Sequence, residues 1–172
     1  MLEKKMSRIK SLAPWQWAAL VLLRVIIGWH FLYEGLAKAF NPYWSSASYL
    51  AEAKWLFPDF FMAIVASPHW LKIVDFLNIG GQIAIGLGLI TGFLTTPACL
   101  AGLVLLALYY ITNPPLIGFK SSMPAEGSYL IVNKNLVELA SLLVLALFPT
   151  GRVAGLDRLI LGPLKARSSR EE

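Results

Sequence analysis

Long apolar blocks alternate with short polar stretches along the chain, and four of the blocks approach the length of a membrane span. They cover about residues 15–39, 71–93, 97–111 and 129–148. At a rise of about 1.5 Å per residue, the first, second and fourth can cross the roughly 30 Å hydrocarbon layer of a bilayer, and the third is marginal. The pattern predicts an all-α membrane protein, a four-transmembrane-helix bundle in one domain of residues 1–172.

The connection between the first two blocks, residues 41–70, is long but not polar. Its apolar runs are too short to span a bilayer, and Pro58 interrupts them, so we expect an interfacial helical outer loop. This loop would either act as a lid over the bundle or fill the groove between helices. In the tail, residues 150–172, the segment GRVAGLDRLILGPLKAR is typical of an amphipathic helix on the cytoplasmic membrane surface.

Glycines concentrate in the second and third blocks, where they would allow helices to approach closely in lipid. The glycines expected to serve in this way are Gly80, Gly81, Gly86, Gly88, Gly92 and Gly102.

Composition and charge agree with a membrane protein. Of the 172 residues, 57% are hydrophobic and only 15% are charged, whereas a soluble domain has about 25% charged residues. The net charge of +5 comes from basic residues that gather before the first block and after the fourth. This distribution fits membrane topology better than nucleic-acid binding, and it predicts a bacterial inner-membrane protein with both termini in the cytoplasm.

Few residues can hold a metal or a haem. Cys99 is the single cysteine, which excludes an intramolecular disulfide, a CxxC redox pair and an all-cysteine iron–sulfur site. The two histidines, His30 and His69, fall on the first block and in the outer loop, whereas a bis-histidine haem uses ligands from two buried helices. We therefore expect neither a metal nor a haem.

Ionisable residues interrupt the first block, in the stretch GWHFLYEGLAKAF. A lysine or arginine at mid-bilayer costs about 2.5–3.5 kcal/mol by insertion assays, so such residues usually face the interior of a bundle. At 100° per residue, Arg24, His30, Glu34 and Lys38 share one face, which we expect to point inward. Glu34 is four residues from both His30 and Lys38, so both can donate to it.

The other three blocks bring polar side chains to the same, outer half of the bundle. These side chains include Asn78 and Gln82 in the second block, Tyr109 and Tyr110 in the third, and Lys134, Asn135 and Glu138 in the fourth. This convergence predicts a polar site that opens to the periplasm or the outer leaflet. In the alternative interpretation, the ion pairs and amide hydrogen bonds only hold the helices together.

Several motifs resemble those of the DoxX/DoxD membrane proteins. The spacing Arg24, Glu34-Gly35, Lys38 is similar to that family's Arg and Gly-x-x-Lys pattern, as are the glycine-rich second block and the closing FPTGRVAGLD. The stretches WSSASYLAEA and EGSYLIVNKNLVE resemble the DoxD-type subgroup, which is similar to the large subunit of thiosulfate:quinone oxidoreductase. The chain departs from many members by offering Gln82 where they carry a carboxylate.

The resemblance implies a four-helix bundle that oxidises thiosulfate to tetrathionate, with quinone as the electron acceptor and a separate small subunit as partner. For such chemistry, the proton donors are expected to be His30, Glu34 and Lys38. The aromatic walls would be Trp29, Tyr33, Tyr109 and Tyr110, and Lys134 would add positive charge for an anionic substrate. Arg24 would bind an oxyanion or reach backbone oxygens of the fourth helix.

Three functions remain open from the sequence. The first is a membrane oxidoreductase that couples oxidation of a small periplasmic substrate to quinone reduction. The second is a non-catalytic membrane subunit or scaffold that recruits a soluble periplasmic oxidoreductase, and the third is a small-solute carrier. The expected partners are the lipid bilayer, quinone, a small periplasmic or membrane subunit and other copies of the chain, but no nucleic acid.

Overall fold

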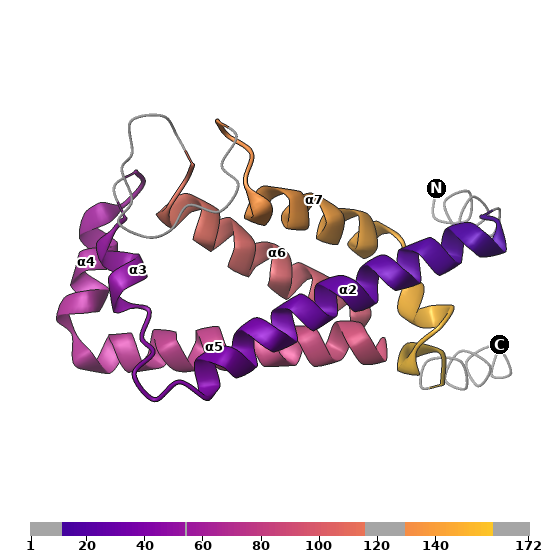
Figure 1. Cartoon of the computed structure of the whole chain (residues 1–172), viewed down its shortest axis with the longest axis horizontal. Coiled ribbons are helices and arrows are strands. Elements are labelled where there is room, and N and C mark those ends of the chain that lie inside the picture. The colour runs from indigo at the N-terminus through magenta and orange to yellow at the C-terminus, as the bar shows by residue number, and fades with distance from the viewer. Residues whose placement is uncertain (1–11, 54, 116–129, 160–172) are drawn as a thin grey trace, which may run out of the picture.

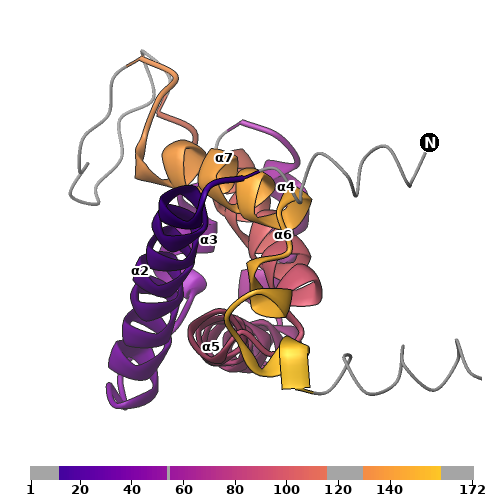
Figure 2. The same cartoon turned by 90° about the vertical axis from the view of Figure 1, so that its right-hand side faces the viewer.

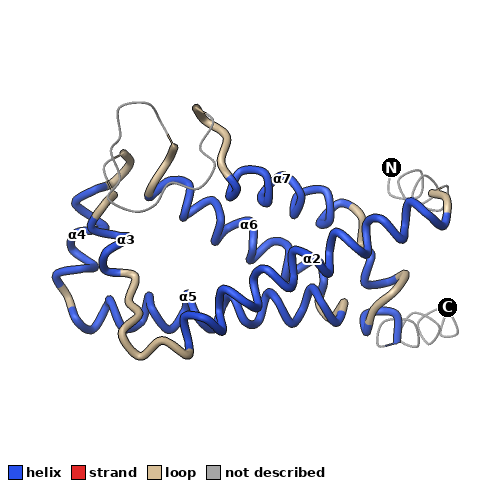
Figure 3. The backbone as a smooth tube through the Cα atoms, in the orientation of Figure 1, coloured by secondary structure: helices blue, strands red, loops and turns tan. Residues whose placement is uncertain are grey.

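The computed structural model describes residues 12–53, 55–115 and 130–159, and the regular secondary structure in these ranges is helical (Figure 3). The elements are α2 (Pro14–Ala39), α3 (Ala47–Ala51), α4 (Pro58–Ala66), α5 (Pro68–Thr91), α6 (Thr95–Thr112), α7 (Lys134–Leu147) and the 3-10 helix η1 (Thr150–Arg152). Prolines occupy the first helical position of α2, α4 and α5, where the missing N–H costs nothing because that group has no partner within a helix.

Three of these helices, α2, α5 and α6, are long and apolar enough to cross a membrane. They match the first three predicted spans to within a few residues. The fourth predicted span, 129–148, corresponds to the shorter helix α7. Helix α7 starts at Lys134 because the side chain of Asn133 caps it, accepting a hydrogen bond of 3.0 Å from the backbone N–H of Leu136. The structure describes the predicted C-terminal amphipathic segment, residues 151–167, only as far as residue 159.

The long helices form two closely packed pairs, α2 with α5 and α6 with α7, and α5 also packs against α6. Figures 1 and 2 show that α2 begins beside α7 and then diverges from it, ending at the level of α5. The short helices α3 and α4 lie across the end toward which α2 diverges, here called the α3–α4 end (Figure 1). The core between the helices consists of Ile27, Phe31, Ile85, Leu89, Ala98, Cys99, Leu106, Leu142 and Leu145.

Glycines bring the backbones of α2 and α5 into direct contact. A Cβ atom added to Gly86 would lie 2.5 Å from the backbone nitrogen of Leu32, and one added to Gly28 would lie 2.9 Å from Cβ of Leu89. The prediction of close helix approach is therefore right for Gly86. It is wrong for Gly80 and Gly81, because a Cβ atom at either position would meet nothing within 4 Å.

Residues 150–159, here called the C-terminal strap, fold back onto the turn between α5 and α6. The carboxylate of Asp157 accepts hydrogen bonds of 2.8 Å from the backbone N–H of Leu94 and 3.0 Å from that of Thr95, and one of 2.8 Å from the Thr95 hydroxyl. These groups are free donors at the start of α6, so Asp157 caps that helix from a distant part of the chain. Gly92 ends α5 with φ of +67°, a conformation that favours glycine.

Arg24 anchors the strap to α2. Its guanidinium donates to the backbone oxygen of Ala154 at 2.7 Å and to the hydroxyl of Thr150 at 3.3 Å, and the residue is only 2% exposed. Arg24 was expected to bind an oxyanion or to reach backbone oxygens of the fourth helix. The backbone oxygen that it reaches, that of Ala154, lies just beyond the end of α7. This end of the bundle, here called the strap end, is opposite the α3–α4 end (Figure 1).

The close α2–α5 contact predicts opposite effects for two glycine substitutions on one helix. Gly86→Ala should destabilise the protein by roughly 1–3 kcal/mol, because the new methyl group overlaps the α2 backbone. Gly80→Ala should be neutral or stabilise by up to about 1 kcal/mol, because alanine favours the helix and meets open space. Thermal unfolding of the purified variants in one detergent measures both effects. Equal stabilities of the two variants would contradict this packing.

The strap predicts an acid-sensitive contribution to stability. Burial alone would raise the pKa of Asp157, but the hydrogen bonds from Thr95 and Leu94 lower it below its usual value. The ionised Asp157 thus stabilises the folded protein fully above the ordinary aspartate pKa of about 3.9. This stabilisation is lost as the pH falls through the lowered pKa that Asp157 has in the folded protein. Asp157→Asn should cost about 1–3 kcal/mol near neutral pH and progressively less at acid pH. Unfolding measured from pH 7 to pH 3 tests this, and a pH-independent difference would contradict it.

Candidate functional site

A half-open pocket of about 330 Å³ lies between α2, α5, α6 and α7 toward the α3–α4 end. Every long helix contributes to its lining, and so does the segment that leads into α3. The lining residues are His30, Phe31, Glu34, Lys38, Trp44, Ser45, Ser46, Ser48, Tyr49, Asn78, Gln82, Leu106, Tyr109, Lys134, Asn135 and Glu138. A concave site with apolar walls and a few convergent polar groups is typical of small-molecule binding.

Lys38 is the most thoroughly surrounded cation of this pocket. Its ammonium group lies 2.7 Å from Oε1 of Gln82 and 3.5 Å from Oε2 of Glu34, and its side chain is 16% exposed. The same nitrogen lies 5.5 Å and 5.7 Å from the ring centroids of Trp44 and Tyr109. Carboxylate, amide and ring faces together stabilise a charge removed from water.

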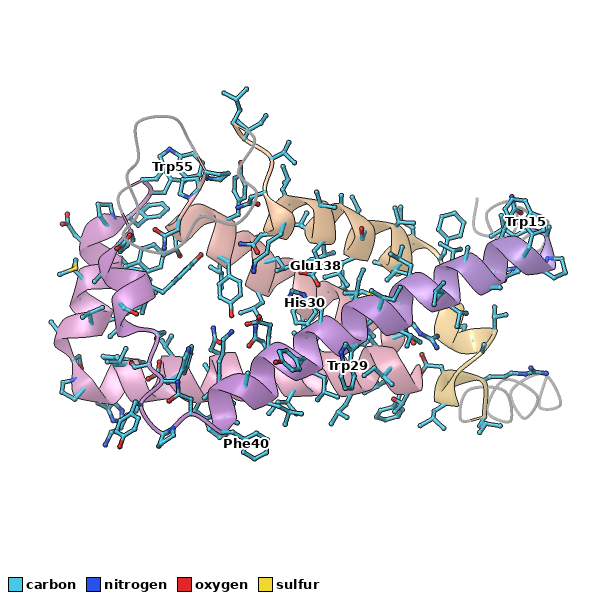
Figure 4. All side chains as sticks on the ribbon, in the orientation of Figure 1. Trp15, Trp29, His30, Phe40, Trp55 and Glu138 are labelled. Atoms are coloured by element: carbon cyan, nitrogen blue, oxygen red, sulfur yellow. The ribbon has the colours of Figure 1, made fainter. Side chains whose placement is uncertain are left out.

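His30 pairs with a different partner from the one that the helical spacing predicted. Nδ1 of His30 lies 2.8 Å from Oε1 of Glu138 on α7, and Figure 4 shows the two side chains pointing toward one another. The prediction that His30 and Lys38 both donate to Glu34 is therefore half right, because only Lys38 does so. The reason is tertiary: α7 places its carboxylate nearer to the imidazole than Glu34 lies.

The residues before α3 form the pocket wall at the α3–α4 end, because α5 holds them in place. The carboxylate of Asp75 accepts hydrogen bonds from the Ser46 backbone N–H at 2.8 Å and from the hydroxyls of Ser45 at 2.9 Å and Ser46 at 2.5 Å. The hydroxyl of Tyr49 donates to the backbone oxygen of Tyr109 at 2.8 Å. Burial raises the pKa of Tyr49 to about 12, so its hydroxyl stays a donor at all ordinary pH values.

One buried polar atom of the pocket lacks a partner among the described residues. The side-chain nitrogen of Asn78 donates to the hydroxyl of Tyr109 at 2.7 Å, but the side-chain oxygen of Asn78 accepts no hydrogen bond. A buried unsatisfied acceptor costs about 1–3 kcal/mol. Since Asn78 lines the pocket, a ligand that brings a donor there would recover that free energy.

Most of the predicted site residues meet in this pocket. It brings together Glu34, Lys38, His30, Asn78, Gln82, Tyr109, Lys134, Asn135 and Glu138 from four helices.

Four predicted residues lie elsewhere. Trp29 and Tyr33 are 62% and 61% exposed on the outer face of α2, so the expectation that they form pocket walls is wrong. They are one position from inward-facing residues, which turns them away by 100°. Tyr110 likewise lies outside the pocket and donates its hydroxyl to the backbone oxygen of Ile131. Arg24 binds the C-terminal strap instead, near the other end of the bundle.

Sequence reasoning missed the wall formed by residues 44–49. Trp44 and Tyr49 sit in a loop and a short helix without helical periodicity, and the resemblance of WSSASYLAEA to the DoxD-type subgroup did not indicate that this stretch lines the site. One signal was available. Asp75 lies on the same helix face as Asn78, and a carboxylate at that position requires hydrogen-bond donors from another segment. In the ranges that the structure describes, no group of three or more His, Cys, Asp or Glu side chains is arranged to hold a metal ion.

Comparisons of the chain with protein-family models, curated proteins and solved structures found no match. The resemblance to the DoxX/DoxD proteins therefore stays a prediction, which depends on the order and spacing of the motifs quoted above.

The His30–Glu138 pair predicts a measurable coupling between α2 and α7. A double-mutant cycle with His30→Gln and Glu138→Gln should give a coupling free energy of about 1 kcal/mol near pH 6, because the pair is only partly buried. The matched cycle with His30→Gln and Glu34→Gln should give a coupling near zero. Thermal unfolding in detergent provides all the values. Larger coupling in the second cycle than in the first would show that the imidazole pairs with Glu34.

Proposed function

We propose that the chain is a membrane oxidoreductase in which this pocket transfers electrons from a small sulfur oxyanion to a quinone, while side chains of the pocket deliver protons taken from water. The observation that carries the proposal is the meeting of Lys38, Glu34, His30 and Glu138 in one pocket that also has aromatic and aliphatic walls. Ionisable residues at membrane depth are costly, and they commonly mark a functional site. Protonatable groups beside apolar walls are what a quinone head requires.

The residues fit a quinone head in several respects. Lys38 and Asn135 are donors for a carbonyl oxygen, and the unpartnered oxygen of Asn78 is an acceptor for a hydroxyl of the reduced form. Phe31 and Leu106 supply apolar surface against the ring. Bound there, a quinone supplies two-electron oxidation.

The chain's own residues would hold the anion and deliver protons. The reaction joins two thiosulfate ions through a new S–S bond, which gives tetrathionate and releases two electrons to the quinone, and the quinone takes up two protons that come from water. Lys38 and Lys134 supply positive charge for the anion. His30 and Glu138, 2.8 Å apart, can move a proton between α7 and the pocket, and Glu34, 3.5 Å from Lys38, can pass a proton on within the pocket.

The same proposal assigns the membrane topology. Helix α7 is too short to cross the bilayer alone, since its 14 residues rise only about 21 Å. The exposed apolar residues Leu130, Ile131 and Val132 that precede it would complete a fourth span. Both termini would then lie in the cytoplasm of a bacterial inner membrane, with α3 and α4 at its periplasmic interface. This places the pocket in the outer half of the membrane.

Two substitutions separate proton transfer from substrate binding. Glu34→Gln should lower kcat by about 100-fold or more while changing KM little, because it removes a protonatable group but keeps its shape. Lys38→Met should raise KM for thiosulfate by roughly 10–100-fold, because one charge-assisted hydrogen bond is lost. The assay follows thiosulfate-dependent reduction of a soluble quinone by the purified chain in detergent.

Phe76→Leu is the matched control, because Phe76 is exposed on α5 away from the pocket, and it should turn over like the parent. Normal turnover by both pocket variants would contradict the proposed site. Absence of turnover by the folded parent, together with a stable soluble partner that co-purifies, would favour a recruiting subunit over a self-sufficient enzyme.

A further inference from the structure

Two ionisable side chains of α2 that line the half-open pocket are partly exposed at membrane depth. The side chains of His30 and Glu34 are 42% and 39% exposed. Centred on α2, a hydrocarbon layer of about 30 Å would place His30 about 10 Å and Glu34 about 4 Å inside its boundary at the α3–α4 end. Contact with hydrocarbon would cost each charge several kcal/mol. Polar atoms, from water in the pocket or from the head of a ligand, must therefore meet these side chains.

Among the described residues, α2 and α7 are the neighbouring long helices around the pocket that contact each other least. Helices α2 and α7 contact each other far less than α2 contacts α5 or α6 contacts α7, and they diverge toward the α3–α4 end (Figures 1 and 2). The gap is here called the α2–α7 opening, with His30 and Glu34 on one edge and Lys134 and Glu138 on the other; all four line the pocket. The His30–Glu138 pair marks the closed corner of this opening (Figure 4).

The other lateral sides of the pocket are bounded by helices that pack against each other. Helices α5 and α6 pack against each other, and Asp75 fixes the wall formed by residues 44–49. The surface beside the opening is apolar, since Tyr33 on α2 and Val137 on α7 are 61% and 57% exposed. Each of them is one position from an edge residue of the opening, Glu34 or Glu138.

We propose that the α2–α7 opening is the lateral entrance for a long-tailed quinone, which reaches the pocket from within the outer leaflet. The inference rests on the proposed function. The polar head lies beside His30, Glu34 and Lys38, which accounts for the charged groups at membrane depth. The tail leaves through the opening over Tyr33 and Val137, which gives these exposed apolar side chains a ligand to contact. The sulfur oxyanion instead arrives from the aqueous side.

Photolabelling tests the route without relying on turnover. A decyl-tailed quinone with a diazirine at the end of its tail is bound to the full chain in lipid nanodiscs, irradiated and mapped by mass spectrometry. The expected labels fall on α2 near Tyr33 and on α7 near Val137, and an excess of the tail-less quinone removes them. Competable labels confined to residues 41–66 would overturn the lateral route while leaving quinone binding intact.

A bulky side chain placed beside the opening gives an independent kinetic test. Val137→Trp should raise KM for the decyl-tailed quinone by about tenfold and leave KM for the tail-less quinone unchanged. The matched control is Leu143→Trp, since Leu143 is 51% exposed on another face of the same helix, and it should behave like the parent. Equal KM changes for both quinones in Val137→Trp would overturn the entrance. No competable label and no quinone reduction by the folded parent would overturn the proposed function as well.

Discussion

The direct contact between the backbones of α2 and α5 determines how the rest of the structure is arranged. Gly86 lets α5 approach the backbone of α2 at Leu32, and this approach brings Lys38 within 2.7 Å of Gln82 one turn further along. With larger side chains at the contact, the helices would separate by the width of a side chain and this hydrogen bond would break. The position of the principal cation in the pocket therefore depends on residues that carry no chemistry of their own.

Charge balance is the second constraint on the pocket. Acidic and basic side chains alternate around it, with Glu34 beside Lys38 and Glu138 beside His30. Such pairing offsets part of the cost of removing ions from water, which no single unpaired charge could do. It also leaves the pocket with little excess charge.

The sequence predicted the long helices well, because block length and hydrophobicity are local properties, and it predicted the convergence of Asn78, Glu138 and their neighbours from depth alone. It could not predict that His30 pairs with Glu138, since that choice depends on the angle between α2 and α7. Trp29 was misjudged because its residue type suggested a pocket wall while its angular position pointed outward. The serine-containing wall before α3 had no periodicity from which a position could be inferred.

The C-terminal strap has a consequence for the order in which the protein is made. In the proposed membrane orientation, Arg24 enters the membrane with the first span, yet its hydrogen-bond partners follow 126 and 130 residues later in the chain. Until Thr150 and Ala154 have been synthesised, the guanidinium must be accommodated by water, lipid head groups or the insertion machinery. The turn between α5 and α6 likewise lacks its capping carboxylate until Asp157 has been synthesised. Completion of the last residues of the strap thus closes the strap end of the bundle, and a chain that stops short of them would keep a buried cation without its acceptors.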